Sequence, residues 1–325
     1  MTMTLREHYT FKALEIVKAH SNHLYRFWFV CLKNNLKSFS FLSIIMPITI
    51  FRCAHKPEEL NENFERLFKE CDVLMVEQGV KDGRNNLEKF YNQVSFGEQH
   101  PIDFFRDFFT YGAFDNYVYK LVSFLSNSGK RVVIEDSPMT VNELKKWEIL
   151  FTGSLGAYYT GNLQDACRMQ IKALECMKEL DNRREDSLKK QLVMLQRENR
   201  ESKILFPIGA EHLIYYKLKD KGLEVKQEFP YKPYFLSYGS EVHRRVTVSK
   251  PYTNEMIARL FPERIVEGHL MKSGLSLSKA TERARKISGR LSYEDVKDLS
   301  INTRENFPNV IESTILWLRK KGFEL

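Results

Sequence analysis

The chain lacks paired cysteines. Its five cysteines are an odd number, lie scattered over 325 residues and form no CxxC pair. A disulfide-stapled secreted domain or a zinc ribbon needs cysteines at short, paired spacings, so neither class is indicated. We expect a protein of a reducing, cytoplasmic compartment.

The sequence also lacks an apolar run long enough to cross a bilayer. Its most apolar stretch, FLSIIMPITIF, covers only residues 41–51, whereas a spanning helix needs about twenty residues. The start of the chain does not have the basic segment and short apolar core of a secretory signal. We therefore expect no membrane span, and peripheral membrane contact stays open.

Charge of one sign is in moderate excess and unevenly placed. The net charge is +8, and residues 1–52 carry seven basic and two acidic residues. This bias favours an acidic lipid surface or nucleic acid as partner, and a solvated basic helix face explains it equally well. The 43% of hydrophobic residues, with 23 Phe and 15 Tyr, indicates a folded chain with a sizeable core.

Hydrophobic periodicity predicts an alternation of strands and helices. Short apolar, β-branched runs predict buried strands at residues 43–51, 72–79, 131–136, 204–208 and 223–229. Helical spacing predicts helices at residues 57–70, in the aromatic-rich stretch 86–126, in the charged stretch 141–200 and up to Lys221. Prolines and aromatics then predict irregular structure to about residue 252, followed by helices that include a helix–turn–helix pair at 275–299.

This order of elements predicts an α/β fold. We expect a central mixed sheet built from two strand–helix–strand repeats, with a helical insertion and a helical C-terminal tail. The predicted domains are an N-terminal helical segment (1–42), an α/β domain (43–252) with its insertion at about 86–200, and a C-terminal helical region (255–325).

Two similar units carry polar residues at matching places. IFRCAH precedes a helix and then DVLMVEQ, and ILFPIGAEH precedes a helix and then LEVKQEF. Each first strand ends in a turn with a histidine, His55 or His212, and each second strand carries a glutamate, Glu77 or Glu228. Because open α/β sheets bind ligands beyond the carboxyl ends of their strands, we expect both histidines on one edge of a shared sheet. Glu135 ends another apolar strand near this edge.

Two imidazoles with one or two carboxylates suit a divalent metal that keeps one position open for water. Such a metal lowers the pKa of the bound water and generates a nucleophile. We therefore predict His55, Glu77 and His212 as ligands of Mn, Co or Zn, and Glu135 as a further catalytic candidate. Without a metal, a histidine oriented by a glutamate activates water as a general base. The alternative for each residue is a capping histidine or a surface ion pair.

Four segments carry a resemblance to a known group: IFRCAHKPEEL, DVLMVEQG, RREDSLKKQL and ILFPIGAEHLIYYKLKDKGLEV. In this order they resemble the superfamily of TraB and pheromone-shutdown proteins, Tiki metalloproteases, erythromycin esterases and haem-binding ChaN proteins. The similarity covers residues 43–230, about three-fifths of the chain. GAEH has the glycine typical of the second turn, whereas CAH has no glycine at the start of the first.

The resemblance implies a set of site residues, namely His55, Glu77, Arg184 and His212. Arg184 matches the arginine of the family's helix because Glu185 follows it and Leu188 lies four residues on. Its implied role is to hold an oxyanion or a site carboxylate with two hydrogen bonds. A surface ion pair in a charge-rich helix is the alternative. His243 has no partner in the pattern, and we leave it out of the site.

These observations predict a hydrolase that cleaves a peptide or ester bond of a peptide or small-molecule substrate with a divalent metal. The second hypothesis is a non-catalytic protein that binds haem or a peptide, because fold does not determine function. The third is a nucleic-acid-associated regulator acting through residues 255–325, with a structural cap on the sheet as its alternative. The sequence leaves the substrate and the oligomeric state open.

Overall fold

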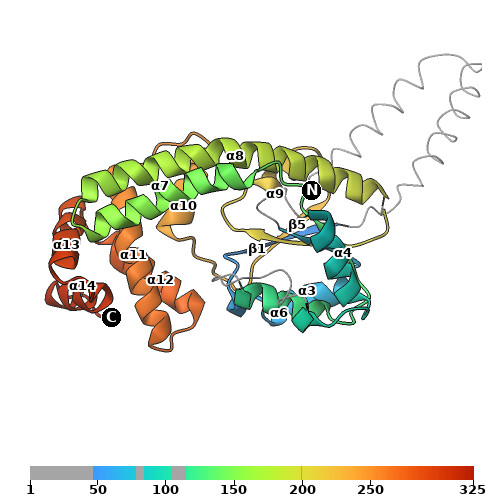
Figure 1. Ribbon diagram of the computed structural model, residues 1–325, viewed down its shortest axis with the longest axis horizontal. Helices are drawn as coiled ribbons and strands as arrows, with labels where there is room; N and C mark the ends of the chain where they lie inside the picture. The colour runs from blue at the N-terminus through green and yellow to red at the C-terminus, as the bar shows by residue number, and fades with distance from the viewer. Residues whose placement is uncertain (1–46, 78–83, 104–114, 199) are drawn as a thin grey trace, which may run out of the picture. The chain divides into compact units, whose positions relative to one another are not determined.

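A five-stranded parallel sheet forms the centre of the predicted α/β region (Figure 1). The computed structural model describes residues 47–77, 84–103, 115–198 and 200–325, so the predicted segment 1–42 lies outside the described residues. The chain divides into Met1–Ile45 and Met46–Leu325, and only the second unit is described below. The strands are β1 (Ile48–Cys53), β2 (Val73–Val76), β3 (Arg131–Ile134), β4 (Ile204–Gly209) and β5 (Val225–Glu228).

The strand order β3-β2-β4-β1-β5 interleaves the two predicted repeats. Strand β4 lies between β1 and β2, and β1 lies between β4 and β5. The α/β class is confirmed, but every strand pair among the described residues is parallel, whereas the sequence predicted a mixed sheet. The reason is that each connection contains a helix, which returns the chain to the edge where the preceding strand began. Because Cys53 lies opposite Gly209, the turns after β1 and β4 leave the same edge as neighbours.

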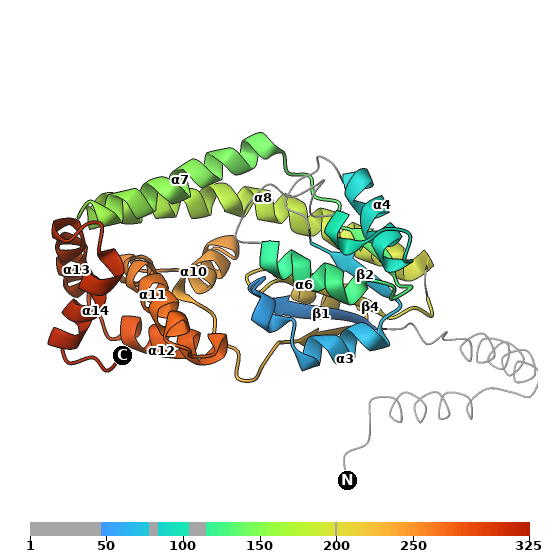
Figure 2. The same cartoon turned by 60° about the horizontal axis from the view of Figure 1, so that its bottom comes forward.

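Helices cover both faces of the sheet (Figure 2). One face packs against α3 (Glu62–Glu70), α4 (Arg84–Ser95) and α6 (Asp115–Leu125), and the other against α8 (Leu163–Glu198) and α9 (Ile214–Lys219). Successive side chains alternate between these faces, so Phe51 packs toward α3 while Ile50 packs toward α8. Burying such a side chain contributes about 1.5–3 kcal/mol, which fixes the orientation of each strand and of the residues that follow it.

The predicted helical stretch 141–200 forms α7 (Val141–Tyr159) and α8. Thr140 and Glu143 cap the start of α7 reciprocally, and Gly161, with φ of 82°, allows the tight turn before α8. The second half of α8 buries Leu188 and Leu192 against the sheet, while its first half packs with helices further along the chain. Helix α8 therefore contributes to two cores.

The last part of the chain forms a helical layer against α7 and α8. It contains α10 (Tyr238–Thr247), α11 (Asn254–Lys272), α12 (Leu277–Gly289), α13 (Tyr293–Glu305) and α14 (Val310–Lys320). Helix α10 corrects the prediction of irregular structure to residue 252. Ser237 caps it, and burial of Val242 and Val246 against neighbouring helices outweighs the local proline and aromatic signals. No helix of the described chain is long and apolar enough to span a bilayer.

We predict that the stability of this helical layer depends on pH because of one buried carboxyl group, that of Glu263 in α11. It is 2% exposed, its Oε2 accepts the N–H of Tyr238 at 2.6 Å, and burial raises its pKa to about 8. The folded state therefore retains a proton that the unfolded state releases near pH 4.5. The stabilisation is complete below that pH and is lost as the pH rises through about 8. The loss amounts to at most about 5 kcal/mol, at 1.36 kcal/mol per pKa unit.

We expect Glu263→Gln to remove this dependence, because glutamine keeps the acceptor and cannot ionise. Urea unfolding of both proteins between about pH 5 and about pH 9 measures it, with the exposed Glu312→Gln as matched control. Identical pH slopes for the wild type and Glu263→Gln would contradict the prediction.

Candidate functional site

Two carboxylates reach the carboxyl edge of the sheet because strand alternation continues past the strand ends. Val73 and Met75 of β2 face α8, and Glu77 follows at the same spacing. Val133 of β3 also faces α8, and Glu135 follows it, with its N–H donated to the carbonyl of Val76 at 3.0 Å. Both glutamates therefore point to the face that α8 covers.

The turn after β1 holds His55 in a left-handed conformation. His55 has φ of 54°, a region that non-glycine residues seldom occupy. Glu59 fixes this turn, since its Oε2 accepts the N–H groups of Ala54 at 2.6 Å and Lys56 at 3.2 Å. The imidazole packs edge-to-face on Tyr117, with ring centroids 5.1 Å apart. The positive φ thus falls on the histidine itself in a turn that has no glycine.

The turn after β4 depends on Gly209. A Cβ at this position would lie 2.7 Å from Glu211 Oε1 and 3.1 Å from His212 Cδ2, so a side chain would have to displace Glu211 and push against the His212 ring. The N–H of Gly209 donates to Glu77 Oε2 at 2.8 Å. The glycine of GAEH therefore makes room for the histidine ring and supplies a donor to the site.

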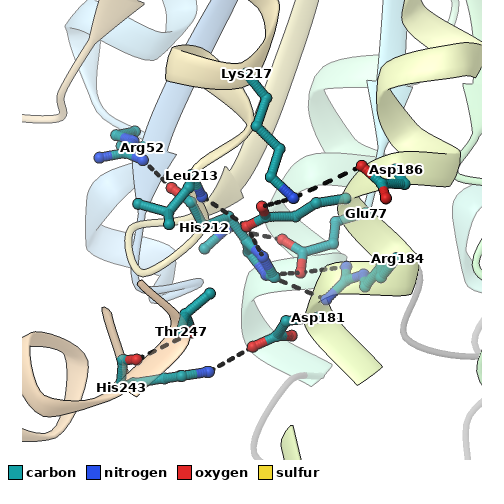
Figure 3. A network of polar contacts seen from close by, with 12 residues as sticks. Arg52, Glu77, Asp181, Arg184, Asp186, His212, Leu213, Lys217, His243 and Thr247 are labelled. Atoms are coloured by element: carbon teal, nitrogen blue, oxygen red, sulfur yellow. Dashed lines mark hydrogen bonds and ion pairs between the residues drawn. The ribbon is translucent and has the colours of Figure 1, made fainter. Parts of the chain in front are cut away.

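One carboxylate joins the two histidines. Glu77 Oε2 lies 2.8 Å from His55 Nε2. Glu77 Oε1 lies 3.4 Å from His212 Nε2, and Figure 3 shows Glu77 beside this ring. His55 and His212 are 157 positions apart in the sequence, and their rings share this one partner. The predicted proximity of the two turns is thus present in the structure.

Arg184 of α8 occupies the centre of this charged cluster. Its Nη2 donates to Glu77 Oε1 and to Glu135 Oε2, both at 2.5 Å, and its Nε donates to Glu135 Oε1. Its Nη1 lies 3.1 Å from His212 Nε2. At 5% exposed, Arg184 is not in a surface ion pair, and it holds a carboxylate with two hydrogen bonds as the resemblance implied. The structure therefore brings together all five predicted residues: His55, Glu77, Glu135, Arg184 and His212.

Glu185 belongs to the same cluster and was not predicted as a site residue. Its Oε1 accepts the N–H of Leu213 at 2.7 Å and lies 3.6 Å from His212 Nδ1, and its Oε2 lies 2.9 Å from Lys217 Nζ. Glu185 lies three positions before Leu188 on the buried side of α8. That spacing was a usable signal, because it places a carboxylate on the face that packs against the sheet.

His243 was left out of the predicted site, and the structure gives it a partner. Its Nε2 lies 2.5 Å from Oδ2 of the buried Asp181 of α8 (Figure 3). The two residues are 62 positions apart, and the pair forms only through packing of α10 on α8, so no local pattern could have indicated it. Glu228, the predicted counterpart of Glu77, lies outside the cluster and pairs with Lys232 at 3.6 Å.

Burial and charge act against each other on the titrating groups. Burial raises the pKa of Glu77, but Arg184 and His55 outweigh it and hold that pKa well below the usual range. Burial lowers the pKa of His55, and the negative charge of Glu77 outweighs it and raises that pKa well above 6.5. Burial raises the pKa of Glu135 despite the opposing charge of Arg184. For His212, Glu185 and Glu77 outweigh burial and Arg184 and raise the pKa to about 10.

The predicted set of metal ligands does not fit this arrangement. Among the described residues, no group of three or more His, Cys, Asp or Glu side chains could hold a metal ion. The physical reason is that Glu77 directs both oxygens to donors, and Arg184 places a positive charge 2.5 Å from one of them. A divalent cation there would face the guanidinium at close range.

The fold and the site define a class of protein: an α/β chain with helices on both faces of a parallel sheet and a buried charged cluster at the carboxyl edge of that sheet. No protein-family model, curated protein or solved structure matches the chain. The resemblance to the TraB, Tiki, erythromycin esterase and ChaN superfamily thus stays a prediction from its motif residues.

Proposed function

We propose that this chain is a hydrolase that cleaves an ester or peptide bond at the carboxyl edge of the sheet. The observation that carries the proposal is the shared carboxylate of Glu77, which contacts His55 on one oxygen and Arg184 and His212 on the other. A histidine oriented by a fixed carboxylate is the arrangement that general-base activation of water requires.

His55 is assigned the role of general base, because it and Glu77 form the accessible side of the cluster. Their side chains are 16% and 15% exposed, whereas His212 and Arg184 are 4% and 5% exposed. In the proposed step, His55 takes a proton from a water whose oxygen adds to the carbonyl carbon, and Glu77 stabilises the imidazolium that forms. The imidazolium then returns the proton to the leaving alcohol or amine as its bond to the carbonyl carbon breaks. Arg184 and His212 act as positioning residues. Both contact Oε1 of Glu77, the oxygen that His55 does not contact, and so fix the carboxylate in place.

Catalysis by Cys53 as a thiol nucleophile explains the geometry of the site less well than activation of water by His55. Cys53 raises the pKa of His55 through a hydrogen bond, which places its sulfur next to the imidazole. Its side chain is completely buried, with Sγ 3.8 Å from the Tyr117 hydroxyl. Since a nucleophile must contact the substrate, water activation by the partly exposed His55 accounts better for the geometry.

The proposal is tested with His55→Asn on chromogenic esters and peptide anilides. We expect the wild type to hydrolyse at least one of these classes and kcat/KM to fall about 100-fold or more in the variant, the usual contribution of a general base. His100→Asn, at an exposed position, is the matched control and is expected to keep full activity. Equal rates for the wild type and His55→Asn, or no hydrolysis by the folded wild type, would falsify the proposal.

The rate is expected to rise with pH. A general base works in its neutral form, and Glu77 raises the pKa of His55 well above 6.5, so the active form gains population toward alkaline pH. Measuring kcat/KM from about pH 6 to about pH 9.5 shows this, because the ascending limb reports the pKa of the essential base in the free enzyme. A rate that declines steadily above neutral pH would rule out His55 in this role.

The proposal includes a cytoplasmic site of action. Among the described residues, Cys53, Cys71, Cys167 and Cys176 are all free cysteines. Free thiols in a folded chain are typical of a reducing compartment, where disulfides do not persist.

A further inference from the structure

Arg52 is a buried cation at the end of β1, on the far side of His212 from Arg184 (Figure 3). It is 2% exposed and is first among the largest fully buried side chains of the described chain. Its position alternates with Ile48 and Ile50, so it points to the face of the sheet that α8 and α9 cover. The charged cluster around Glu77 does not include it.

No carboxylate of the described chain forms an ion pair with Arg52. Its Nη2 donates to the backbone carbonyl of His212, and its Nε is buried with no hydrogen-bond partner among the described residues. A buried charge is costly unless it is paired and hydrogen-bonded. The described chain therefore neither pairs the charge of the Arg52 guanidinium with a carboxylate nor accepts a hydrogen bond from its Nε.

The charged groups near Arg52 include a second arginine, Arg244 of α10. Burial, and next the positive charge of Arg244, lower the pKa of Arg52 to about 10, so Arg52 remains charged at neutral pH. Glu185 and Glu211 act in the opposite direction from beyond ion-pairing distance. The Nε of Arg244 is also buried without a partner in the described chain. Two neighbouring guanidiniums with unused donors are typical of an anion site.

A cleft of about 960 Å³ is lined by residues of α9 and α10, among them Arg244, whereas Arg52 is not part of the lining. Arg244 and Lys250 line it without an ion pair in the described chain, whereas the lining cations Lys217 and Arg245 are paired with carboxylates. Tyr216 forms part of the wall, and the guanidinium carbon of Arg52 lies 5.7 Å from the centre of its ring. Two carboxylates also line the cleft: Glu241 pairs with Arg245 and Arg285, and Asp220 has no ion pair in the described chain. Unpaired cations therefore outnumber unpaired carboxylates in the lining by two to one.

We propose that this cleft binds the phosphate group of a small organic ligand, with Arg244 as the anion-binding residue of its lining and Arg52 adding positive charge from behind Tyr216. Guanidinium groups match the geometry of phosphate oxygens and bind them with paired hydrogen bonds. The volume suits a small molecule, and the apolar lining residues Leu213, Tyr216 and Val248 offer surface for the rest of the ligand. The cleft adjoins the Glu77 cluster through Lys217, which pairs with Glu185, but phosphate binding there does not depend on the proposed hydrolysis.

The test measures inorganic phosphate binding to the full chain. We expect phosphate and sulfate to raise Tm above its value in chloride or acetate of equal ionic strength, because an anion that binds only the folded state stabilises it. We expect calorimetric titration to give a phosphate Kd that is weaker by about tenfold or more in Arg244→Met, which loses a charge-assisted hydrogen-bond donor in the cleft. We expect a weaker Kd in Arg52→Met as well, because it loses the positive charge next to the cleft. Arg244 is half-buried, so its variant remains informative if Arg52→Met fails to fold.

Arg168→Met is the matched control for loss of one positive charge, because Arg168 is an exposed residue of α8 paired with Asp165. Its phosphate Kd is expected to equal that of the wild type. The proposal fails if phosphate has no effect on wild-type Tm beyond that of chloride. It also fails if acetate binds as tightly as phosphate, or if Arg244→Met retains the wild-type Kd.

Discussion

Replacing Arg184 with methionine is expected to destabilise the fold by about 3–5 kcal/mol, the cost of breaking a buried ion pair by removing one partner. Arg184 donates to both Glu77 and Glu135, and Glu135 is completely buried. Without the guanidinium, these carboxylates face each other in a region of low dielectric constant, and at least one must take up a proton. Urea unfolding at neutral pH measures the loss.

The neighbouring residue provides the control for this experiment. Arg183 is on the same helix, but it is 50% exposed and pairs with Glu143 at the surface. Arg183→Met is therefore expected to leave the unfolding midpoint unchanged, as exposed ion pairs contribute little. Adding Glu135→Gln to Arg184→Met is expected to recover part of the loss, because it removes one unpaired charge. If Arg183→Met and Arg184→Met have equal effects, the cluster around Glu77 does not stabilise the fold as described.

Glu77→Gln is expected to lower kcat/KM by about 100- to 10,000-fold, the range that proton-transfer catalysis contributes. Glutamine keeps the size of the side chain but removes the negative charge that faces His55 at 2.8 Å. It also presents an amide N–H₂ group where one oxygen had accepted hydrogen bonds. The imidazolium loses its stabilising partner, so the pKa of His55 falls and the residual pH–rate profile moves toward acid pH.

Glu228→Gln is the matched control for this substitution. Glu228 is the glutamate that the second repeat predicts in place of Glu77, and the structure places it outside the cluster, paired with Lys232. We expect its substitution to leave both rate and pH profile unchanged. A large loss in Glu228→Gln, or a pH profile that does not move in Glu77→Gln, would contradict the assignment of Glu77.

The sequence predicted the positions of the cluster because they follow from strand alternation. Glu77 and Glu135 continue the spacing of buried residues in β2 and β3, and this spacing alone directs them toward α8. His55 and His212 end the strands of two repeats that interleave as β1 and β4. Arg184 was implied only by the resemblance, in which Glu185 follows the arginine and Leu188 lies four residues on, and the same spacing to the buried Leu188 makes it face the sheet.

Other parts of the site depend on tertiary contacts that no local pattern encodes. The partner of His243 is Asp181, which lies on a different helix, α8. Helix α10 itself forms because Val242 and Val246 are buried against neighbouring helices. Arg52 was counted only as one basic residue of a charged first segment, yet it is buried at the end of β1. The expected metal does not fit for a similar reason, since the sequence did not show that Arg184 already engages the carboxylate between the histidines.

Histidine-selective ¹⁵N NMR of the wild type and Glu77→Gln tests the shared carboxylate most directly, because ring nitrogen shifts report hydrogen bonding and protonation. If one carboxylate joins both rings, the substitution shifts the ring signals of His55 and His212 and leaves that of the exposed His100 in place. A change in only one of the two site histidines, or in neither, would contradict the account.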